Sequence, residues 1–408
     1  MKSIVSICIA CAFAFGQGGT FQDIYPQGKK FPLGLYSIAG DKQKIEELKK
    51  DGWNFGQVYS FEKNKEAFLS LAKAAEISVM ASIQIELEKE LPKDKTIALI
   101  SECAESENVL WWDMPEERRF WYSEEFDAVK NVFNWSREYD PYKRPCYMYI
   151  ASQYIQEDIK HYLPYLDIIP SSVYTTYTMM PHAWVRWRNE ETVNAIVKNG
   201  YEIGPNYLKG QKTPVAIIEL FYEPTKDDVF PVAMGPQGAY HDFWQSIVSG
   251  AKGIIVFSLV HGTDPQSKYY KDIFTQNWQQ YCKAAGEISG SENIGQAVLF
   301  GKKIDTIKTD IIDGCTRTPE FVPHGTKLPP ISYPSVDTLA IEYEGYLYLI
   351  AVNSSESYAK ACFSNIPKSV KTGRQLFSCR DKIIDINDAK FEHNFASLGV
   401  AIFKFNLN

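Results

Sequence analysis

Two short apolar runs in the chain each end in a carboxylate, and these positions are the first candidates for chemistry. Residues 109–112 (VLWW) lead into Asp113, and Glu116 follows after a methionine and a proline. Residues 215–218 (VAII) lead into Glu219 in the same way. Two carboxyl groups that face each other can cleave a glycosidic bond, because one donates a proton while the other attacks or activates water. Their separation would decide between retention and inversion.

Each of these acids also has a structural alternative. Glu219 could be a salt-bridged structural acid, and Asp113 could cap the turn that contains the proline. Glu116 and Glu117 directly precede two arginines. They could therefore form a solvated cluster of ion pairs on the surface.

Eight strand-then-helix units precede residue 298, which is the number and length of a (β/α)8 barrel. The expected strands are residues 31–38, 54–60, 78–84, 109–117, 145–152, 166–174, 213–221 and 253–260. The expected helices are residues 41–50, 63–76, 92–106, 123–139, 157–165, 182–199, 239–251 and 268–288. No glycine-rich phosphate turn follows the first strand, which argues against a doubly wound sheet.

The acids lie where such a barrel carries its chemistry, at the C-terminal ends of strands. Asp113 ends the fourth strand and shares its side-chain parity with Val109 and Trp111. Glu219 ends the seventh strand and shares its parity with Ile217. One parity of each strand faces the barrel axis, and the sequence does not say which.

Polar and aromatic residues close the other strands and are candidates for binding a sugar. Aromatic faces can stack on pyranose rings, and hydroxyl, amide and imidazole groups can bond sugar hydroxyls. A tyrosine at a strand end is equally compatible with ordinary core packing. The candidates are Tyr36, Tyr59, Gln84, Tyr149, Tyr174 and His261 at strand ends, and His182 in the connection after the sixth strand. That connection also carries Trp184, Arg186 and Trp187, which could form an outer subsite or one face of an amphipathic helix.

The pattern changes after the barrel. Residues 299–408 alternate short apolar runs with Gly, Asn, Ser and Pro turns, which predicts a small antiparallel β-sandwich. Expected strands include residues 338–344, 346–353, 359–363 and 401–406, while residues 313–334, with five prolines, form a loop or linker. The domains expected are thus a barrel over residues 17–298 and a sandwich over residues 299–408.

The first 16 residues have the form of a secretory signal. Met1 and a lysine precede an apolar run, residues 4–15, and a small-x-small cleavage site. We therefore expect a secreted or periplasmic protein; a lipoprotein attached through Cys11 is a weaker alternative. No later segment is long and apolar enough to span a bilayer. The net charge of -7 argues against nucleic acid as a partner.

Neither a metal nor another cofactor is expected from the sequence. The six histidines show no H-x-x-x-H or H-x-H spacing, and there is no G-x-S-x-G elbow. Removal of the leader would leave six scattered cysteines, which are more typical of buried small residues than of a disulfide framework. The alternative is a disulfide between Cys362 and Cys379.

The strand-four and strand-seven acids give the chain a resemblance to a known group of enzymes. It resembles the (β/α)8 glycoside hydrolases of the clan that includes families 5 and 42. These enzymes place an acid/base carboxylate after strand four and a nucleophilic glutamate after strand seven, and a small β-sandwich often follows the barrel. The resemblance implies that Glu219 is the nucleophile or base, that a carbohydrate is the substrate, and that no cofactor is needed.

The fourth strand departs from the pattern of this clan. The clan usually has Asn-Glu-Pro or Asp-Glu-Pro there, whereas this chain has Asp113-Met114-Pro115. Asp113 or Glu116 would then replace the usual acid. The alternative is a carbohydrate-binding barrel that has lost catalysis, and another hydrolase or a lyase is also compatible with the fold.

Overall fold

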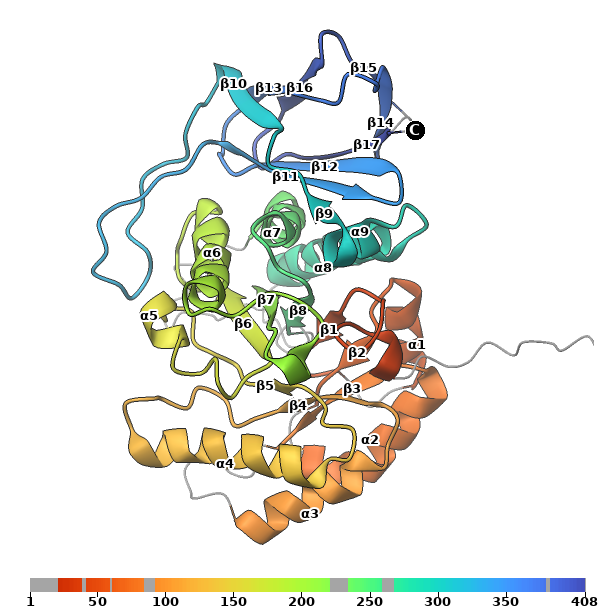
Figure 1. The fold of residues 1–408 in the computed structure, drawn as a ribbon, viewed down its shortest axis with the longest axis vertical. Coiled ribbons are helices and arrows are strands. Elements are labelled where there is room, and N and C mark those ends of the chain that lie inside the picture. Colours follow the sequence, from red (N-terminus) through yellow and green to blue (C-terminus); the bar gives the residue numbers. More distant parts are fainter. Residues whose placement is uncertain are drawn as a thin grey trace, which may run out of the picture.

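The computed structural model describes residues 21–38, 42–58, 61–83, 92–220, 234–258, 268–378 and 382–407. Figure 1 shows a barrel of parallel strands surrounded by helices, with a body of antiparallel strands packed against one side. The fold class predicted from the sequence is therefore confirmed. Among the described residues, no helix combines the length and the apolarity needed to cross a membrane.

The eight barrel strands pair in sequence order, and β8 closes the barrel by pairing with β1. They are β1 (Leu33–Leu35), β2 (Phe55–Gly56), β3 (Ser78–Ser82), β4 (Val109–Asp113), β5 (Cys146–Tyr147), β6 (Ile168–Val173), β7 (Thr213–Glu219) and β8 (Ile254–Phe257). Several are shorter than the apolar runs that predicted them. Beyond the paired residues, single backbone hydrogen bonds still join neighbouring strands. One example is the bond from the Tyr36 N–H to the Val256 carbonyl.

The helices of the barrel lie outside the strands (Figure 1). They are α1 (Lys42–Lys50), α2 (Phe61–Ala75), α3 (Lys93–Ala104), α4 (Ser123–Tyr139), α5 (Gln156–Ile159), α6 (Ala183–Lys198), α7 (Pro236–Val248) and α8 (Lys268–Ser289). Short 3-10 turns occur at Phe21–Asp23 and Tyr207–Lys209. The helix expected at residues 157–165 is a single turn, and a further helix, α9 (Ile294–Phe300), was not predicted.

The residues inside the barrel show which side chains of β4 and β7 face its axis. The interior cluster contains Phe55, Met80, Trp111, Tyr147, Ile168, Val215, Ile217 and Ile255. Trp111 and Ile217 therefore face the axis, and strand alternation turns Asp113 and Glu219 the same way. Val109 is the exception: it joins the outer core, because the register of β3 and β4 shifts between Val79 and Met80.

Residues 21–30, to which the sequence assigned no element, close the N-terminal end of the barrel. Ile24 belongs to the interior cluster, and the Gln27 amide donates to the Leu110 carbonyl at 2.9 Å. This end is opposite to the strand ends that carry the acids. Residues 21–30 therefore cover the N-terminal end of the barrel interior.

The C-terminal region consists of two antiparallel sheets. Its strands are β9 (Lys302–Lys303), β10 (Lys308–Gly314), β11 (Val336–Tyr343), β12 (Tyr346–Asn353), β13 (Ala359–Ser364), β14 (Thr372–Leu376), β15 (Lys382–Asp385), β16 (Lys390–Phe395) and β17 (Val400–Asn406). The sheet orders are β10-β13-β16 and β15-β14-β17-β12-β11-β9. A separate apolar core, which includes Leu349, Phe363 and Phe403, joins the sheets into the predicted sandwich.

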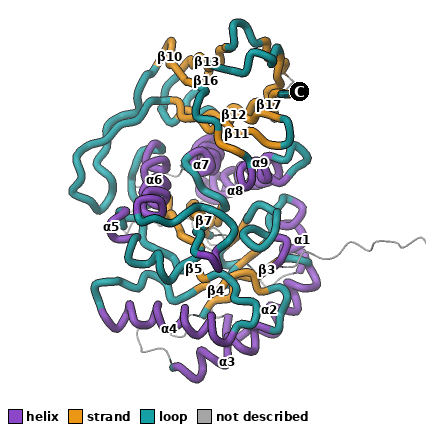
Figure 2. The backbone as a smooth tube through the Cα atoms, in the orientation of Figure 1, coloured by secondary structure: helices purple, strands orange, loops and turns teal. Residues whose placement is uncertain are grey.

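The sandwich packs against α7, which contacts β11, β12 and β17. The connection from β10 to β11 contains the loop predicted at residues 313–334, and Figure 2 shows it descending beside α6. Phe321 in this loop is buried against the barrel core. Barrel and sandwich therefore share an extended interface.

Two of the cysteines, Cys103 and Cys146, are buried as expected for small core residues. The disulfide considered between Cys362 and Cys379 cannot be followed, because Cys379 lies outside the described residues. The signal sequence expected at residues 1–16 lies outside them as well.

Candidate active site

Asp113 lies fully buried at the end of β4. Its Oδ2 accepts a hydrogen bond from the side-chain amide of Gln57 at 3.3 Å, while Oδ1 has no partner within the described part of the chain. Burial raises the pKa of Asp113 well above its ordinary value, and the nearby Glu116 carboxylate raises it further. Burial thus favours the protonated form of Asp113.

Glu116 is half-buried just beyond the end of the same strand. Burial raises the pKa of four tyrosines at the barrel mouth, and the charge of Glu116 contributes to each shift: Tyr36, Tyr147, Tyr149 and Tyr174. Glu116 therefore lies close to the mouth and to Asp113. Met114 is instead fully buried in the outer core and cannot take part in the site.

The tyrosines form a contiguous group across strands β1, β5 and β6. The hydroxyls of Tyr36 and Tyr147 are 2.7 Å apart, and the rings of Tyr149 and Tyr174 stack at 6.1 Å with an interplanar angle of 18°. Phe257 at the end of β8 packs edge-on against Tyr36 at 5.5 Å. The structure thus brings three predicted binding residues, Tyr36, Tyr149 and Tyr174, to one place near Asp113 and Glu116.

Glu219 ends β7 and is almost fully buried. Its Oε1 accepts the backbone N–H of Thr176 at 2.6 Å, and its Oε2 accepts that of Tyr177 at 3.2 Å. Burial raises the pKa of Glu219 to about 7, although these hydrogen bonds oppose the shift. The side chain is therefore held in one orientation and can exchange a proton near neutral pH.

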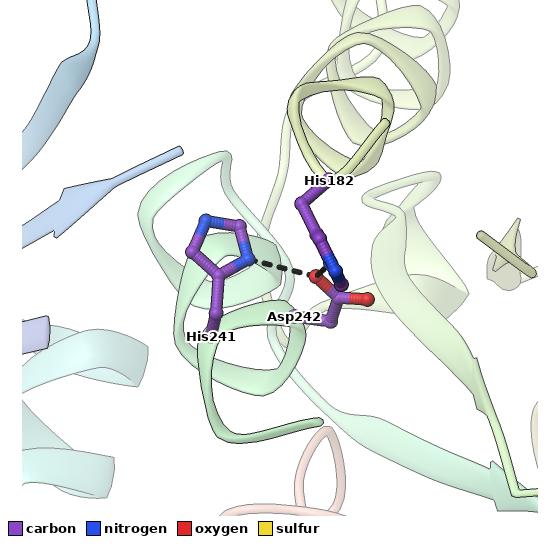
Figure 3. A group of neighbouring side chains, drawn as sticks. All are labelled: His182, His241 and Asp242. Atoms are coloured by element: carbon purple, nitrogen blue, oxygen red, sulfur yellow. Dashed lines mark hydrogen bonds and ion pairs between the residues drawn. The ribbon is translucent and has the colours of Figure 1, made fainter. Parts of the chain in front are cut away.

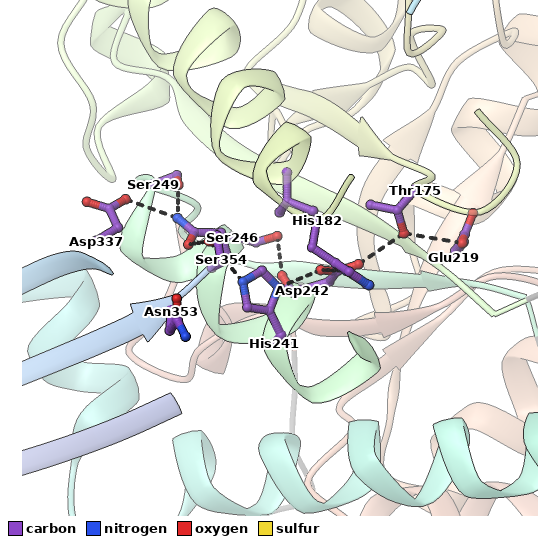
Figure 4. Close-up of polar contacts among 12 residues, drawn as sticks. Thr175, His182, Glu219, His241, Asp242, Ser246, Ser249, Asp337, Asn353 and Ser354 are labelled. Atoms are coloured by element: carbon purple, nitrogen blue, oxygen red, sulfur yellow. Dashed lines mark hydrogen bonds and ion pairs between the residues drawn. The ribbon is translucent and has the colours of Figure 1, made fainter. Parts of the chain in front are cut away.

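His182, His241 and Asp242 form a cluster (Figure 3), which Thr175 connects to Glu219 (Figure 4). The Nδ1 atoms of both histidines lie 2.7 Å from Oδ1 of Asp242. One ligand atom from each residue lies within 4.8 Å of the others, so the set could meet a metal ion. The same atoms are engaged in hydrogen bonds to one another, and we therefore interpret the group as a hydrogen-bonded cluster.

The charges of the cluster stabilise one another. Burial alone would raise the pKa of Asp242, but the two histidines lower it below its ordinary value. Burial would lower the pKa of His182, but the Asp242 carboxylate raises it overall. His241 is buried more completely, and its pKa is lowered.

His182 was predicted to contact sugar, and the structure places it on Asp242 at the start of α6. The outer subsite considered around it is wrong for its neighbours, because Trp184 and Trp187 are buried in the core. Arg186 forms ion pairs with Glu190 and with Asp337 of the sandwich. These residues form the packed face of a helix, which was the alternative interpretation.

Three predicted binding residues, Tyr59, Gln84 and His261, lie outside the described residues. Several residues of the site were not predicted from the sequence: Gln57, Tyr147, Thr175, His241 and Asp242. Parity could have found two of them, because Gln57 lies two positions after the inward Phe55 and Tyr147 lies two positions before Tyr149. Nothing in the local sequence indicates that Asp242 approaches Glu219.

No protein-family model matches the chain, and no curated protein sequence matches it either. Solved structures do match its fold. A glycoside hydrolase family 5 protein from Bacteroides vulgatus superposes with a TM-score of 0.58 at 13% identity, covering 92% of this chain and 89% of its own. A protein described as a glycoside hydrolase gives 0.57 at 12% identity, with 92% of each chain covered. The family 42 β-galactosidase Gan42B from G. stearothermophilus gives 0.53 at 8% identity, covering 93% and 99%.

These likenesses extend over both the barrel and the sandwich, since more than nine-tenths of this chain is covered in each case. The chain is thus a (β/α)8-barrel protein with a C-terminal antiparallel sandwich, an architecture that it shares with these glycoside hydrolases. At such low identities the likeness is one of fold, and function has to be argued from the site.

Proposed function

We propose that the protein is a glycoside hydrolase that cleaves O-glycosidic bonds of a poly- or oligosaccharide. One observation carries the proposal: carboxyl groups lie at the C-terminal ends of β4 and β7 on the same face of the barrel, Asp113 and Glu116 at β4 and Glu219 at β7, and burial raises the pKa of Asp113 and of Glu219. The C-terminal strand ends are where barrels of this type hold their chemistry. The fold shared with several glycoside hydrolases supports the same conclusion.

Glu219 is assigned as the nucleophile or general base. The N–H groups of Thr176 and Tyr177 stabilise its ionised form and fix the direction of its lone pairs. Loss of a proton near pH 7 leaves a carboxylate in a site with little solvent, where it is a better base than an exposed glutamate.

The proton for the leaving oxygen is assigned to Glu116. Asp113 is fully buried, whereas Glu116 keeps exposed surface at the mouth. Burial favours the protonated form of Asp113, which adds no second negative charge beside Glu116. Of the four mouth tyrosines, Tyr149 alone is not buried, so its ring, stacked on Tyr174, is the one available to a sugar beside these acids.

The site of action proposed is outside the cytoplasm, in line with the signal-like sequence at residues 1–16. Export would give the enzyme access to glycans that do not enter the cell. Mass spectrometry of the mature N-terminus tests this part, and retention of residues 1–16 in the exported protein would contradict it.

A non-catalytic carbohydrate-binding barrel is the second candidate. It is favoured by Met114, which takes the position of the usual acid and is fully buried, so that it cannot contribute to a site. Tyr149, which is only half-buried at the mouth, would then contact glycan without cleaving it.

The deciding experiment measures hydrolysis of a panel of glycans and aryl glycosides by the wild type, Glu219→Gln, Glu116→Gln and Asp113→Asn. Each substitution keeps the shape of the side chain and removes a carboxyl group. Glycosidase function predicts turnover by the wild type and a loss of about 100-fold or more in Glu219→Gln. Binding of a glycan without any turnover would support the second candidate instead.

A further inference from the structure

A chain of hydrogen bonds connects the sandwich to Glu219 through the inside of the protein. Figure 4 shows its members. In order from the sandwich, they are Asp337, Gln245, Ser354, His241, Asp242, Thr175 and Glu219. All but Asp337 are buried, so solvent cannot substitute for these contacts.

The donor and the acceptor of each hydrogen bond can be assigned by starting from Asp337 in the sandwich. Asp337 is paired with Arg186 at 3.3 Å, so it is a carboxylate and can only accept. The side-chain amide of Gln245 donates to Asp337 at 3.0 Å and to Ser249 at 2.8 Å. Its carbonyl oxygen therefore faces Ser354 at 2.7 Å, and the Ser354 hydroxyl must be the donor in that contact.

The contacts of Ser354 determine which nitrogen of His241 carries a proton. Ser354 has one hydroxyl proton, which is given to Gln245, so its oxygen accepts from Nε2–H of His241 at 2.9 Å. The other ring nitrogen, Nδ1, lies 2.7 Å from Oδ1 of Asp242. A neutral imidazole that carries its proton on Nε2 would present a lone pair to the carboxylate. These contacts favour a second proton between His241 and Asp242, with the Asp242 carboxylate stabilising it, whereas burial of the imidazole lowers the pKa of His241 and opposes it.

The other oxygen of Asp242 faces the active site. The Thr175 hydroxyl donates to Oδ2 of Asp242 at 3.1 Å and lies 3.5 Å from Oε1 of Glu219. One hydroxyl proton thus lies between two carboxyl groups. The negative charge of Asp242 also raises the pKa of Glu219, after the larger contribution of burial.

We propose that His241 and Asp242 are a positioning pair that sets the ionisation of Glu219 through Thr175, and that Ser354 of the sandwich keeps the shared proton on this pair. The sandwich is then a working part of the active site. The catalytic meaning of this inference rests on the proposed glycosidase function. The effect on the ionisation of Glu219 is independent of that function.

Other ionisable groups surround the same region. Tyr281 on α8 donates its hydroxyl to the backbone carbonyl of Glu219 at 2.8 Å and is neutral. His182 donates to Asp242 from the start of α6, and Glu356 acts on His182 from the turn after β12. Of these groups, only the pair of His241 and Asp242 is linked by hydrogen bonds to both Glu219 and the sandwich.

The test measures the pKa of Glu219 by ¹³C NMR of the full-length protein labelled at the glutamate side-chain carboxyl. Glu219→Gln identifies the resonance by its loss. Ser354→Ala allows His241 to become neutral, which leaves an uncompensated charge on Asp242, so the pKa of Glu219 should rise by about half a unit. Asp242→Asn removes the nearest negative charge and should lower it by about one unit.

The matched control is Ser355→Ala. Ser355 is the adjacent buried serine of the same turn, and its hydroxyl bonds Asn353 and Ser357 instead of His241. This control should leave the pKa of Glu219 unchanged. Equal pKa values in Ser354→Ala and in the wild type, with both proteins folded, would overturn the role of the sandwich.

The link through Thr175 has its own pair of variants. Thr175→Val removes the shared hydroxyl and should raise the pKa of Glu219, while Thr175→Ser should restore it. An unchanged pKa in Thr175→Val would overturn this path. Since the NMR measurement needs no turnover, its outcome stays separate from the failure of the proposed function. If the protein is a glycosidase, the pH profile of kcat/KM should shift in the same directions.

Discussion

The backbone N–H of Thr176 donates a 2.6 Å hydrogen bond to Oε1 of Glu219, so the loop after β6 holds the acid that ends β7. The neighbouring Thr175 side chain bonds Asp242 on α7. Two consecutive βα units, those of β6 and β7, therefore fix one carboxyl group. This arrangement makes the protonation and the orientation of Glu219 properties of the whole fold, and it leads to several measurable expectations.

The first prediction concerns the dependence of stability on pH. Burial raises the pKa of Glu219 to about 7, whereas an ordinary glutamate titrates at about 4.3. Between these values the folded protein keeps a proton that the unfolded chain has released, so the free energy of unfolding falls as pH rises through this window. The share of Glu219 is roughly 3 kcal/mol.

Glu219→Gln cannot ionise and should lack this part of the pH dependence. Urea unfolding of both proteins at pH 5 and pH 8 gives the comparison. The variant should gain stability relative to the wild type at the higher pH. Parallel changes in the two proteins would show that Glu219 titrates normally.

The second prediction separates the two glutamates that follow β4. Glu116→Gln should lower hydrolysis of substrates with sugar leaving groups by about 100-fold, because such groups must be protonated to depart. The loss should be much smaller for a dinitrophenyl glycoside, whose leaving group needs no proton. Glu117→Gln is the matched control and should keep wild-type rates. Equal losses with both leaving groups would remove Glu116 from the role of acid.

The third prediction concerns Met114, where the resembling enzymes have their acid. Met114 is fully buried in the outer core, so Met114→Glu would place a carboxyl group between the barrel and its helices. We expect a loss of several kcal/mol in the free energy of unfolding and no gain in hydrolysis. Met114→Leu should cost less than about 1.5 kcal/mol. An active and stable Met114→Glu variant would contradict the structure at this position.

The fourth prediction tests the buried support of β4. Arg144 is fully buried, and its guanidinium donates to Asp140 at 2.9 Å and to the carbonyl of Ser106 at 2.7 Å. Asp140 also accepts the indole N–H of Trp112, which lies on the outer side of β4. Arg144→Met would leave the charge of Asp140 uncompensated and should cost about 3–5 kcal/mol of unfolding free energy.

Chemical denaturation measures this loss, with Arg119→Met as the control. Arg119 pairs with Glu125 on the surface, where such pairs contribute little. No measurable change is expected in the control. Similar unfolding midpoints for the two variants would contradict the importance of the buried pair.

The order of elements could be predicted from the sequence, because strand and helix periodicity are local properties. The helix at residues 123–139 has the predicted bounds, and β12 has those of its apolar run. The acids that end β4 and β7 were identified by the same local reasoning. The lengths of the strands were less predictable, because the number of paired residues in a strand depends on the neighbouring strands. The two-residue strand β5 is an example.

Which parity faces the barrel axis was decided only by the closed barrel, since both faces of its strands are apolar. The contacts of Glu219 with Thr176 and of Asp242 with Thr175 required the packing of β6, β7 and α7. The contact of His241 with Ser354 joins residues 113 positions apart. The sequence by itself determined which residues could carry a charge at a strand end. The tertiary structure decided which charges meet, because hydrogen bonds between distant segments depend on packing that no local pattern encodes.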